Sequence, residues 1–258
     1  MQTTNGWTFG IVTAPGNDHI LSRCLKTIAD DCAQHSDVEV IVIGKSAPEI
    51  PDGLSVRIVE FQERVPNRSL KHFLKCLRRV RLRDAFTRTG WITRKKNLIA
   101  ELASQHNLCI MHDYVGFMPG WFAGFDRHGD DWSVAVTKIT NADGERHRDW
   151  MVWDYPEVGP SLLPYDRVCS YMYISGAYFC VKRDFFLQNK LDERLFWGEA
   201  EDVEWSLRVR EKTAFSINVH SEVRYLKMKP KDDAPNCSSW IENRKKLMTL
   251  IANNELKS

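Results

Sequence analysis

Four carboxylates gathered within six residues form the densest chemical signal in the sequence. They follow the aromatic run Phe196-Trp197-Gly198, and in order they are Glu199, Glu201, Asp202 and Glu204. Like charges this close repel one another, although a helix that begins among them can hold them through its N-terminal dipole. Alternatively, one carboxylate beside the apolar Trp197 acts as a general base while its neighbour binds hydroxyl groups.

A second candidate site follows the apolar run Leu108–Met111, where the sequence reads His112-Asp113-Tyr114. Ligands of open α/β sheets bind beyond the carboxyl ends of strands, which is where this tripeptide would lie. The carboxylate of Asp113 is an oxygen ligand of the kind that hard cations such as Mg²⁺ or Mn²⁺ prefer. An imidazole from His112 or His220 would favour Mn²⁺. A lone histidine after a strand is often structural, so both explanations of His220 stay open.

The elements that would position these residues begin with alternating strands and helices. Trp7–Thr13 predicts a strand that ends at the turn Ala14-Pro15-Gly16, and the apolar residues of Asp18–Cys32 have helical spacing. Val38–Ile43 is a continuous apolar run, typical of a strand covered on both faces, and Leu54–Val59 predicts a third strand. Strand, helix and strand at this spacing indicate βαβ units and a parallel sheet.

The rest of the chain predicts further elements of both kinds. Helices are expected at Leu70–Val80, Thr93–His106, Arg183–Gln188, Glu201–Glu211 and Ser239–Asn253, and strands at Leu108–Met111, Ile174–Val181 and Phe215–Val219. Trp132–Ile139 and Trp150–Trp153 flank Asn141-Ala142-Asp143-Gly144, which predicts a small hairpin. The expected fold is α/β, with a mostly parallel central sheet, flanking helices and a C-terminal helix. Residues 1–228 would form the domain, and residues 229–258 a polar segment and helix packed on it.

The acidic stretch resembles a motif of a known enzyme family. Phe196–Arg208 is similar to the acceptor-site motif of family 2 glycosyltransferases and their relatives with the GT-A fold. In those enzymes a glycine-containing aromatic stretch leads into Glu-Asp, then an apolar and an acidic residue, then Leu-x-Arg. Other segments between about residues 8 and 225 resemble the family in order and spacing: Thr8–Pro15, Leu21–Ile28, Val38–Ile43, Arg94–Asn97, Leu108–Trp121 and Ser175–Ala177.

The resemblance implies a GT-A, Rossmann-like domain that transfers a sugar from a nucleoside diphosphate sugar to an acceptor hydroxyl. It implies that Asp202 is the catalytic base and that Glu201 contacts the acceptor sugar, while Trp197 suits a sugar-stacking platform. The residues expected to bind the donor, the nucleoside diphosphate sugar, are Thr13, Ala14, Pro15, Arg94, Asn97, Asp113 and Gly176. A Mn²⁺ or Mg²⁺ ion would be held by Asp113, His112 and His220. One base without a second carboxylate nucleophile favours direct displacement with inversion.

Two departures from the family pattern limit these implications. The metal motif of the family usually contains two acidic residues, whereas His112-Asp113-Tyr114 offers one. Many relatives also have an acidic residue near the nucleobase after the second strand, where this chain reads Gly44-Lys45-Ser46. The identity of the base therefore stays open, with a UDP-sugar slightly favoured.

A basic segment raises the question of an anionic partner. Arg64–Lys96 contains 12 Lys and Arg residues and one acid, Asp84. It could be a solvated helical face, or it could meet a diphosphate-linked acceptor, an anionic membrane surface or nucleic acid. A net charge of +2 over 258 residues argues against a general binder of polyanions such as nucleic acid.

Two other functions stay open, a nucleotidyltransferase and a non-catalytic protein that binds membrane or nucleic acid. A nucleotidyltransferase normally has a glycine-rich loop with a cation after its first strand, and Ala14-Pro15-Gly16-Asn17 has no cation. No stretch approaches the ~20 apolar residues of a membrane span, and seven cysteines without a CxxC pair indicate reduced, buried thiols. We expect a cytoplasmic protein, with peripheral membrane contact through Arg64–Lys96, that acts on a glycan or lipid-linked acceptor.

Overall fold

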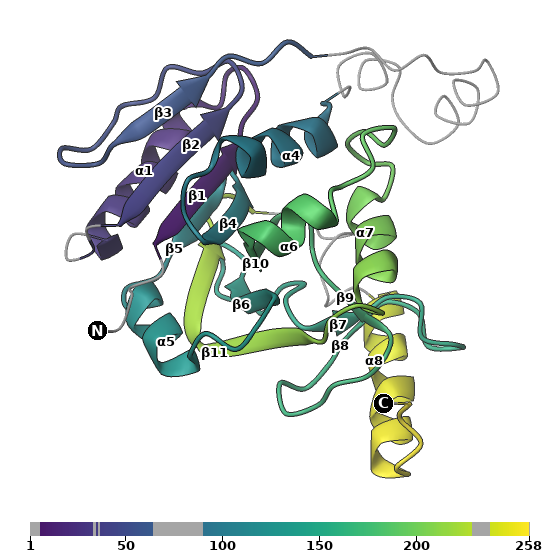
Figure 1. Ribbon diagram of the computed structural model, residues 1–258. Coiled ribbons are helices and arrows are strands. Elements are labelled where there is room, and N and C mark those ends of the chain that lie inside the picture. Colours follow the sequence, from purple (N-terminus) through teal and green to yellow (C-terminus); the bar gives the residue numbers. More distant parts are fainter. Residues whose placement is uncertain (1–5, 33–34, 36, 64–89, 229–237, 258) are drawn as a thin grey trace.

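The computed structural model is organised around one central sheet (Figure 1). It describes residues 6–32, 35, 37–63, 90–228 and 238–257. Over this part of the chain the sheet has eight strands in the order β3-β2-β1-β4-β10-β6-β11-β5. A separate sheet of three short strands has the order β8-β7-β9. The predicted α/β class, with a mostly parallel sheet and flanking helices, is confirmed.

Parallel strands form the amino-terminal half of the central sheet. Its elements are β1 (Trp7–Val12), α1 (Asp18–Cys32), β2 (Val38–Ile43), β3 (Val56–Val59), α4 (Ile92–Leu102) and β4 (Asn107–His112). β1 pairs in parallel with both β2 and β4, and β2 with β3. All six residues of β1 are buried, as expected for a strand with neighbours on both sides and helices on both faces.

The second half of the sheet mixes strand directions. Its elements are β5 (Val115–Phe117), α5 (Trp121–His128), β6 (Val134–Thr140), β10 (Tyr178–Lys182), α6 (Arg183–Gln188), α7 (Glu201–Val209) and β11 (Phe215–Tyr225). β10 runs antiparallel to both β4 and β6, so β6 has the direction of β4, and β11 runs parallel to β6. The carboxyl ends of β1, β4, β6 and β11 therefore meet at one edge, together with the start of β10.

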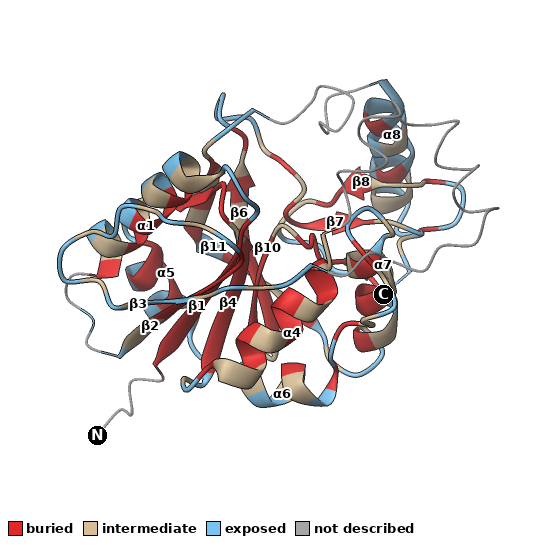
Figure 2. Cartoon of the chain, turned by 90° about the horizontal axis from the view of Figure 1, so that it is seen from above, coloured by how far each residue is buried: buried red, intermediate tan, exposed pale blue. Residues whose placement is uncertain are grey.

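Helices cover both faces of this sheet (Figure 2). On one face, α1 and α5 enclose a core that includes Leu25, Trp121 and Phe125. On the other face, α4, α6 and α7 enclose a second core that includes Ile99, Phe186 and Trp205. The sheet is therefore held rigid from both sides, and the loops at its edge project from a fixed base.

The predicted hairpin is wrong in its pairing. β7 (Met151–Val152) lies between β8 (Ser161–Leu162) and β9 (Met172–Tyr173) in the small sheet instead of pairing with β6. β11 pairs with β6 along one side, whereas on the other side β10 pairs with its first residues, Val134 and Ala135. The end of β6 on that side is met by the returning chain, where the N–H of His147 donates to the carbonyl oxygen of Ile139 at 2.8 Å, and β7 lies beyond this contact in the small sheet. The chain does reverse after β6, where an isolated bridge joins Thr140 to Arg146.

Two predicted strands also have different limits. Ile174–Val181 is interrupted, since β9 ends at Tyr173 and β10 begins at Tyr178. Phe215–Val219 is the beginning of a longer strand, because a bulge between Asn218 and Glu222 lets β11 continue to Tyr225. The helix α8 (Ser238–Ala252) agrees with the expected C-terminal helix, whereas the helix expected at Leu70–Val80 lies outside the described residues. No helix in the described ranges is long and apolar enough to cross a bilayer.

Close packing of β1 against α4 supplies a test of the fold. A Cβ on Gly10 would lie 2.1 Å from Cγ2 of Ile99, so α4 can approach the sheet only because position 10 is glycine. We expect Gly10→Ala to lower the free energy of unfolding by about 1–3 kcal/mol through overpacking, as measured by urea denaturation. In an Ile99→Ala background the same change should cost much less, and equal costs in the two backgrounds would contradict this packing.

Candidate functional site

Two adjoining cavities open where the carboxyl ends of the strands meet. The Asp113 cavity, of about 320 Å³, is lined by Val12, Thr13, Ala14, Asn17, Gly90, Ile92, Lys95, His112, Asp113, Tyr114, Trp197 and Lys227. The Asp202 cavity, of about 360 Å³, is lined mainly by His147, Arg148, Trp153, Tyr173, Ser175, Gly176, Glu201, Asp202 and Tyr225. Both are also lined by His112, Tyr114 and Trp197, so the two spaces share a wall.

Asp113 is a fixed, buried carboxylate at the end of β4. It is 3% exposed, and its Oδ2 accepts hydrogen bonds from Thr13 Oγ1 at 2.7 Å and Asn17 Nδ2 at 2.8 Å. Both donors follow β1, which the parallel register places beside β4. Among the described residues no hydrogen bond reaches Oδ1, so that oxygen can serve a ligand. The sequence pointed to Thr13 but missed Asn17, although a polar side chain just after a strand-end turn is a usable signal.

Lys95 of α4 brings a cation to the same cavity. Its Nζ donates to the carbonyl oxygen of Thr13 at 2.9 Å and pairs with the carboxylate of Glu63. Lys95 is one of three consecutive cations, and successive helical residues point about 100° apart. Arg94, Lys95 and Lys96 therefore face three different surroundings, which the sequence did not distinguish.

The two residues of α4 predicted to bind the donor contact other protein groups. Arg94 Nη1 pairs with Glu101 at 2.8 Å and with Glu193 at 3.1 Å. Asn97 donates to the backbone oxygen of Leu191 and accepts from its backbone N–H, both at 3.0 Å. In the described structure neither side chain lines the Asp113 cavity. Their contacts position the loop of residues 189–194.

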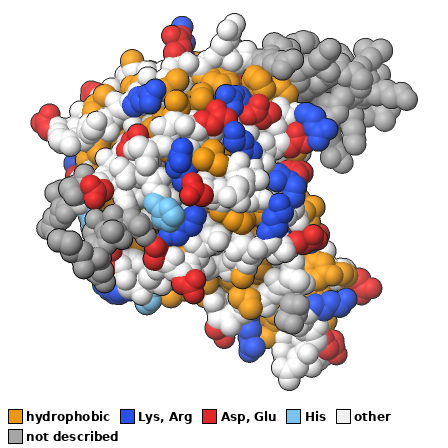
Figure 3. All heavy atoms as spheres, viewed as in Figure 1, with side chains coloured by type: hydrophobic (Ala, Val, Ile, Leu, Met, Phe, Trp, Pro, Cys, Tyr) orange, Lys and Arg blue, Asp and Glu red, His pale blue; other side chains and the backbone are white. Residues whose placement is uncertain are grey.

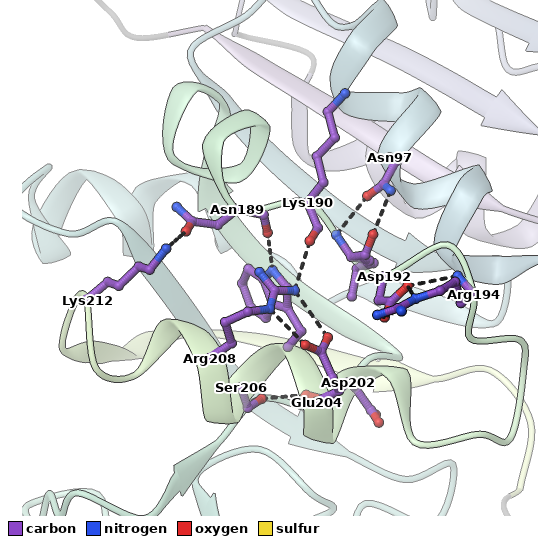
Figure 4. Close-up of polar contacts among 12 residues, drawn as sticks. Asn97, Asn189, Lys190, Asp192, Arg194, Asp202, Glu204, Ser206, Arg208 and Lys212 are labelled. Atoms are coloured by element: carbon purple, nitrogen blue, oxygen red, sulfur yellow. Dashed lines mark hydrogen bonds and ion pairs between the residues drawn. The ribbon is translucent and has the colours of Figure 1, made fainter.

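This loop in turn fixes α7, the helix that carries Asp202 (Figure 4). Trp205 Nε1 donates to the backbone oxygen of Asn189 at 2.6 Å, and Arg208 donates to that of Lys190 at 2.9 Å. Arg208 also pairs with Glu204 at 2.8 Å, which turns this member of the acidic cluster away from Asp202. Glu199, another member, accepts the backbone N–H of Phe196 at 2.9 Å.

Asp202 lines its cavity from the first turn of α7. Its Oδ2 accepts the hydroxyl of Tyr173 and the backbone N–H of Gly176, and its Oδ1 accepts the backbone N–H of Val203 at 3.0 Å. Burial, and then the negative charge of Asp202, hold the pKa of Tyr173 well above its ordinary value. The phenol therefore stays protonated and continues to donate. Three neutral donors thus fix the orientation of the carboxylate, and nothing in the sequence had indicated Tyr173.

Gly176 allows this arrangement because it has no side chain. A Cβ at this position would lie 2.9 Å from Asp202 Oδ2 and 3.0 Å from Lys96 Nζ. Gly176 was predicted to bind the donor, and the structure places it against Asp202 in the wall of the Asp202 cavity.

Glu201 and Lys96 form a buried ion pair beside Asp202. The Nζ of Lys96 lies 3.3 Å from Glu201 Oε1, and Lys96 is 0% exposed. Burial raises the pKa of Glu201 above its ordinary value, the charge of Lys96 opposes that rise, and the charge of Asp202 adds to it. Glu201 was predicted to contact the acceptor sugar; it lines the Asp202 cavity, and its carboxylate is held by Lys96.

The remaining predicted residues divide between the cavities and the surface. Trp197 is 42% exposed at the junction of the two cavities, where a sugar could stack on its ring. Ala14 lines the Asp113 cavity, while Pro15 is exposed and lines neither cavity as described. His112 lines both cavities, with its ring 5.1 Å from that of Tyr114.

His220 is not brought to Asp113. It lies in the bulge of β11, where its backbone N–H donates to Asn218 Oδ1 at 2.9 Å, and the strand continues beyond it to Tyr225. A Cβ on Gly124 of α5 would lie 2.7 Å from the backbone oxygen of His220, so His220 lies beside that helix. Among the described residues no three His, Cys, Asp or Glu side chains form a group that could hold a metal ion.

Solved structures with a similar chain path identify the fold. The crystal structure of GalNAc-T7 with UDP, GalNAc and Mn²⁺ matches with a TM-score of 0.56 and 14% identity, over 97% of this chain and 48% of that chain. S. aureus TarS 1-349 matches with a TM-score of 0.52 and 10% identity, over 84% of this chain and 60% of that chain. The same TarS segment has also been solved in complex with UDP. Both proteins are glycosyltransferases with the GT-A fold, and the chain has this fold.

The chain spans 40% to 60% of the length of these solved chains. No protein-family model and no curated protein matches it. At this level of identity the likeness establishes the fold, and the site itself must carry any argument about activity.

The buried ion pair supplies a prediction about stability and pH. Lys96→Met should lower the free energy of unfolding by about 3–5 kcal/mol at pH 7, because it leaves Glu201 buried without a cation. Without Lys96 the folded-state pKa of Glu201 rises further, so the folded state binds the proton more tightly than the unfolded chain does. The loss should therefore shrink as the pH falls below that raised pKa.

Urea denaturation between about pH 5 and pH 8 would measure this dependence. The double variant Lys96→Met/Glu201→Gln, which has no buried charge at this point, should be more stable than Lys96→Met at pH 8. A pH-independent loss in the single variant would show that Glu201 does not cause it.

Proposed function

We propose that the chain is a glycosyltransferase that moves a sugar from a nucleoside diphosphate sugar to an acceptor hydroxyl, with Asp202 as the base. The observation that carries the proposal is the shared wall of the two cavities. A fixed carboxylate and a lysine line one of them, and a second oriented carboxylate lines the other. A donor and an acceptor bound in these spaces would meet between Asp113 and Asp202, beside Trp197.

The Asp113 cavity suits the nucleoside diphosphate. Lys95 and Lys227 line it and would offset the charge that develops on the departing diphosphate. Two of the GT-A structures that match this chain, GalNAc-T7 and one of TarS 1-349, contain UDP, which supports a UDP-sugar as the donor. A donor of this kind also agrees with the position of the cavity, at the carboxyl ends of β1 and β4.

The donor set at Asp113 is compatible with a divalent cation. Oδ2 is occupied by Thr13 and Asn17, which leaves Oδ1 as one hard oxygen ligand, and the imidazole of His112 lines the same cavity. Mg²⁺ or Mn²⁺ often binds through one carboxylate completed by substrate phosphates and waters. Such a cation, held by Asp113 and adjacent to His112, would stabilise the charge of the diphosphate.

The Asp202 cavity suits an acceptor sugar. Trp153, Tyr173, Trp197 and Tyr225 give it aromatic walls, and sugars pack their C–H faces on aromatic rings. Asp202 would take the proton of the attacking hydroxyl as its oxygen bonds to the anomeric carbon and the bond to the diphosphate breaks. With a single base on the acceptor side, this displacement inverts the anomeric configuration. Tyr173 and Gly176 would keep the carboxylate aimed throughout. The acceptor would be a glycan or a lipid-linked saccharide.

Replacing the base tests the mechanism. Asp202→Asn retains an oxygen for Tyr173 and Gly176, so the fold and UDP binding should survive while transfer falls by about 10²–10⁴-fold. Transfer from labelled UDP-sugars to a saccharide acceptor panel, together with calorimetry of UDP binding, would measure both. Glu204→Gln is a matched control, because this carboxylate pairs with Arg208 outside the cavity, and it should retain transfer. Comparable activity in Asp202→Asn and Glu204→Gln would remove Asp202 from the mechanism.

Replacing Asp113 tests the cation. Asp113→Ala should weaken UDP binding only when Mn²⁺ or Mg²⁺ is present, because the lost oxygen acts through the cation. Calorimetric titrations of wild type and variant, each with Mn²⁺ and with EDTA, would separate the two conditions. An equal loss in EDTA would mean that Asp113 acts on the nucleotide directly or only orders Thr13 and Asn17.

A further inference from the structure

A third cavity continues from the Asp202 cavity toward the C-terminal helix. This α8 cavity, of about 390 Å³, lies between the turn after β6 and α8, and His147 lines both it and the Asp202 cavity. Its other lining residues are Asn141, Asp143, Glu145, Arg146, Leu162, Ile241, Arg244, Lys245 and Met248. Three spaces thus follow one another, from Asp113 past Asp202 to α8.

α8 is tied directly to the groups that orient Asp202. Its Trp240 packs in a cluster with Met151, Leu162 and Tyr173, and the hydroxyl of Tyr173 donates to Asp202. The guanidinium of Arg148, which lines the Asp202 cavity, lies 5.2 Å from the centre of the Trp240 ring. The far wall of the α8 cavity is therefore held in a fixed relation to the proposed base.

One face of α8 lines the cavity. Arg244 and Lys245 come three and four residues after Ile241 and four and three residues before Met248, so all four residues share a face. Ile241 is 46% exposed and Met248 is 42% exposed, so this face of α8 presents apolar surface to the cavity beside its two cations. Figure 3 shows hydrophobic side chains and charged side chains of both signs over the lobe that contains α8.

The chemistry of the lining indicates the ligand. Arg244 and Lys245 on α8 are balanced by Asp143 and Glu145 on the facing turn, while Arg146 pairs with the buried Asp149. Such a balance does not favour an anion. It supplies both donors and acceptors beside the apolar surface of Leu162, Ile241 and Met248. Sugar hydroxyls both donate and accept hydrogen bonds, and the C–H face of a sugar ring packs on apolar groups.

We propose that the α8 cavity binds the sugar units that extend from the attacked residue of an oligosaccharide acceptor. The proposal rests on the function proposed for Asp202 and adds a class of acceptor to it. The saccharide runs from Asp202 past His147 and Arg148 to the exposed face of α8. Longer saccharides consequently bind more tightly than short ones.

Methyl NMR of the full chain tests the site directly. Met248 is one of seven methionines, and its labelled methyl group lies in the cavity wall. In titrations with malto-, cello- and chitooligosaccharides of one to about six units, the Met248 resonance should move with the longer members of at least one series. Lys245→Ala or Arg244→Ala should weaken that binding about tenfold, the value of one charge-assisted hydrogen bond.

Lys246→Ala is the matched control. Lys246 is the next residue of the same helix, but it pairs with Glu242 and does not line the cavity as described, so its removal should leave saccharide affinity unchanged. No movement of Met248 with any saccharide overturns the proposal. Equal losses in Lys245→Ala and Lys246→Ala, or a response to inorganic pyrophosphate alone, overturn it as well.

These measurements do not require turnover, so they separate this proposal from the proposed activity. Saccharide binding at Met248 without sugar transfer would support the saccharide site and contradict the proposed transferase activity. Sugar transfer that depends on Asp202, with no shift of the Met248 resonance and no change of saccharide affinity in Arg244→Ala or Lys245→Ala, would support the transferase activity and contradict the saccharide site.

Discussion

The buried ion pair between Lys96 and Glu201 is the interaction on which the arrangement of the site depends. Lys96 belongs to α4, and the preceding residue of that helix, Lys95, lines the Asp113 cavity. Glu201 immediately precedes Asp202 in α7. The pair therefore joins the helix on the donor side to the helix that carries the proposed base. A buried pair of this kind gains little net stability, but breaking it is costly, so it specifies one relative position of two elements.

The acidic cluster is tolerated because its members have different partners. Glu199 accepts a backbone N–H, Glu201 binds Lys96, and Glu204 binds Arg208. Asp202 is held by neutral donors and lines the cavity. Four adjacent charges would repel one another on a free helix. Here the fold distributes them, so that one carboxylate is presented to the space where an acceptor would bind.

Tyr173 connects this site to the end of the chain. It reaches Asp202 with its hydroxyl and packs its ring with Trp240 of α8. The C-terminal helix is therefore more than an appended element on the surface of the domain. It supports the group that orients the proposed base, and it forms the wall of the cavity beyond.

The sequence by itself indicated many of the elements, though not β5, α5 or β8, and it pointed to the two carboxylates on which the proposed function rests. Continuous apolar runs such as Val38–Ile43 specify buried strands, and Asp113 and Asp202 could be located because each follows a recognisable pattern, a strand end and an acidic helix start. These signals are local, since they depend on residues a few positions apart. The resemblance in order and spacing added the GT-A fold, which the structure confirms.

Only the tertiary structure decided which neighbours each residue has. The sequence could not tell which of Arg94, Lys95 and Lys96 lines the Asp113 cavity. The faces of a helix acquire different surroundings only when the helix packs, and α4 packs on the sheet with Lys95 toward the cavity. The sequence also could not show that His220 lies away from Asp113. A bulge between Asn218 and Glu222 lets β11 continue to Tyr225, so His220 lies within the strand and not at its carboxyl end. Tyr173 joins Asp202 from 29 residues away. Such contacts depend on strand pairing and helix packing between distant segments, and no local pattern encodes them.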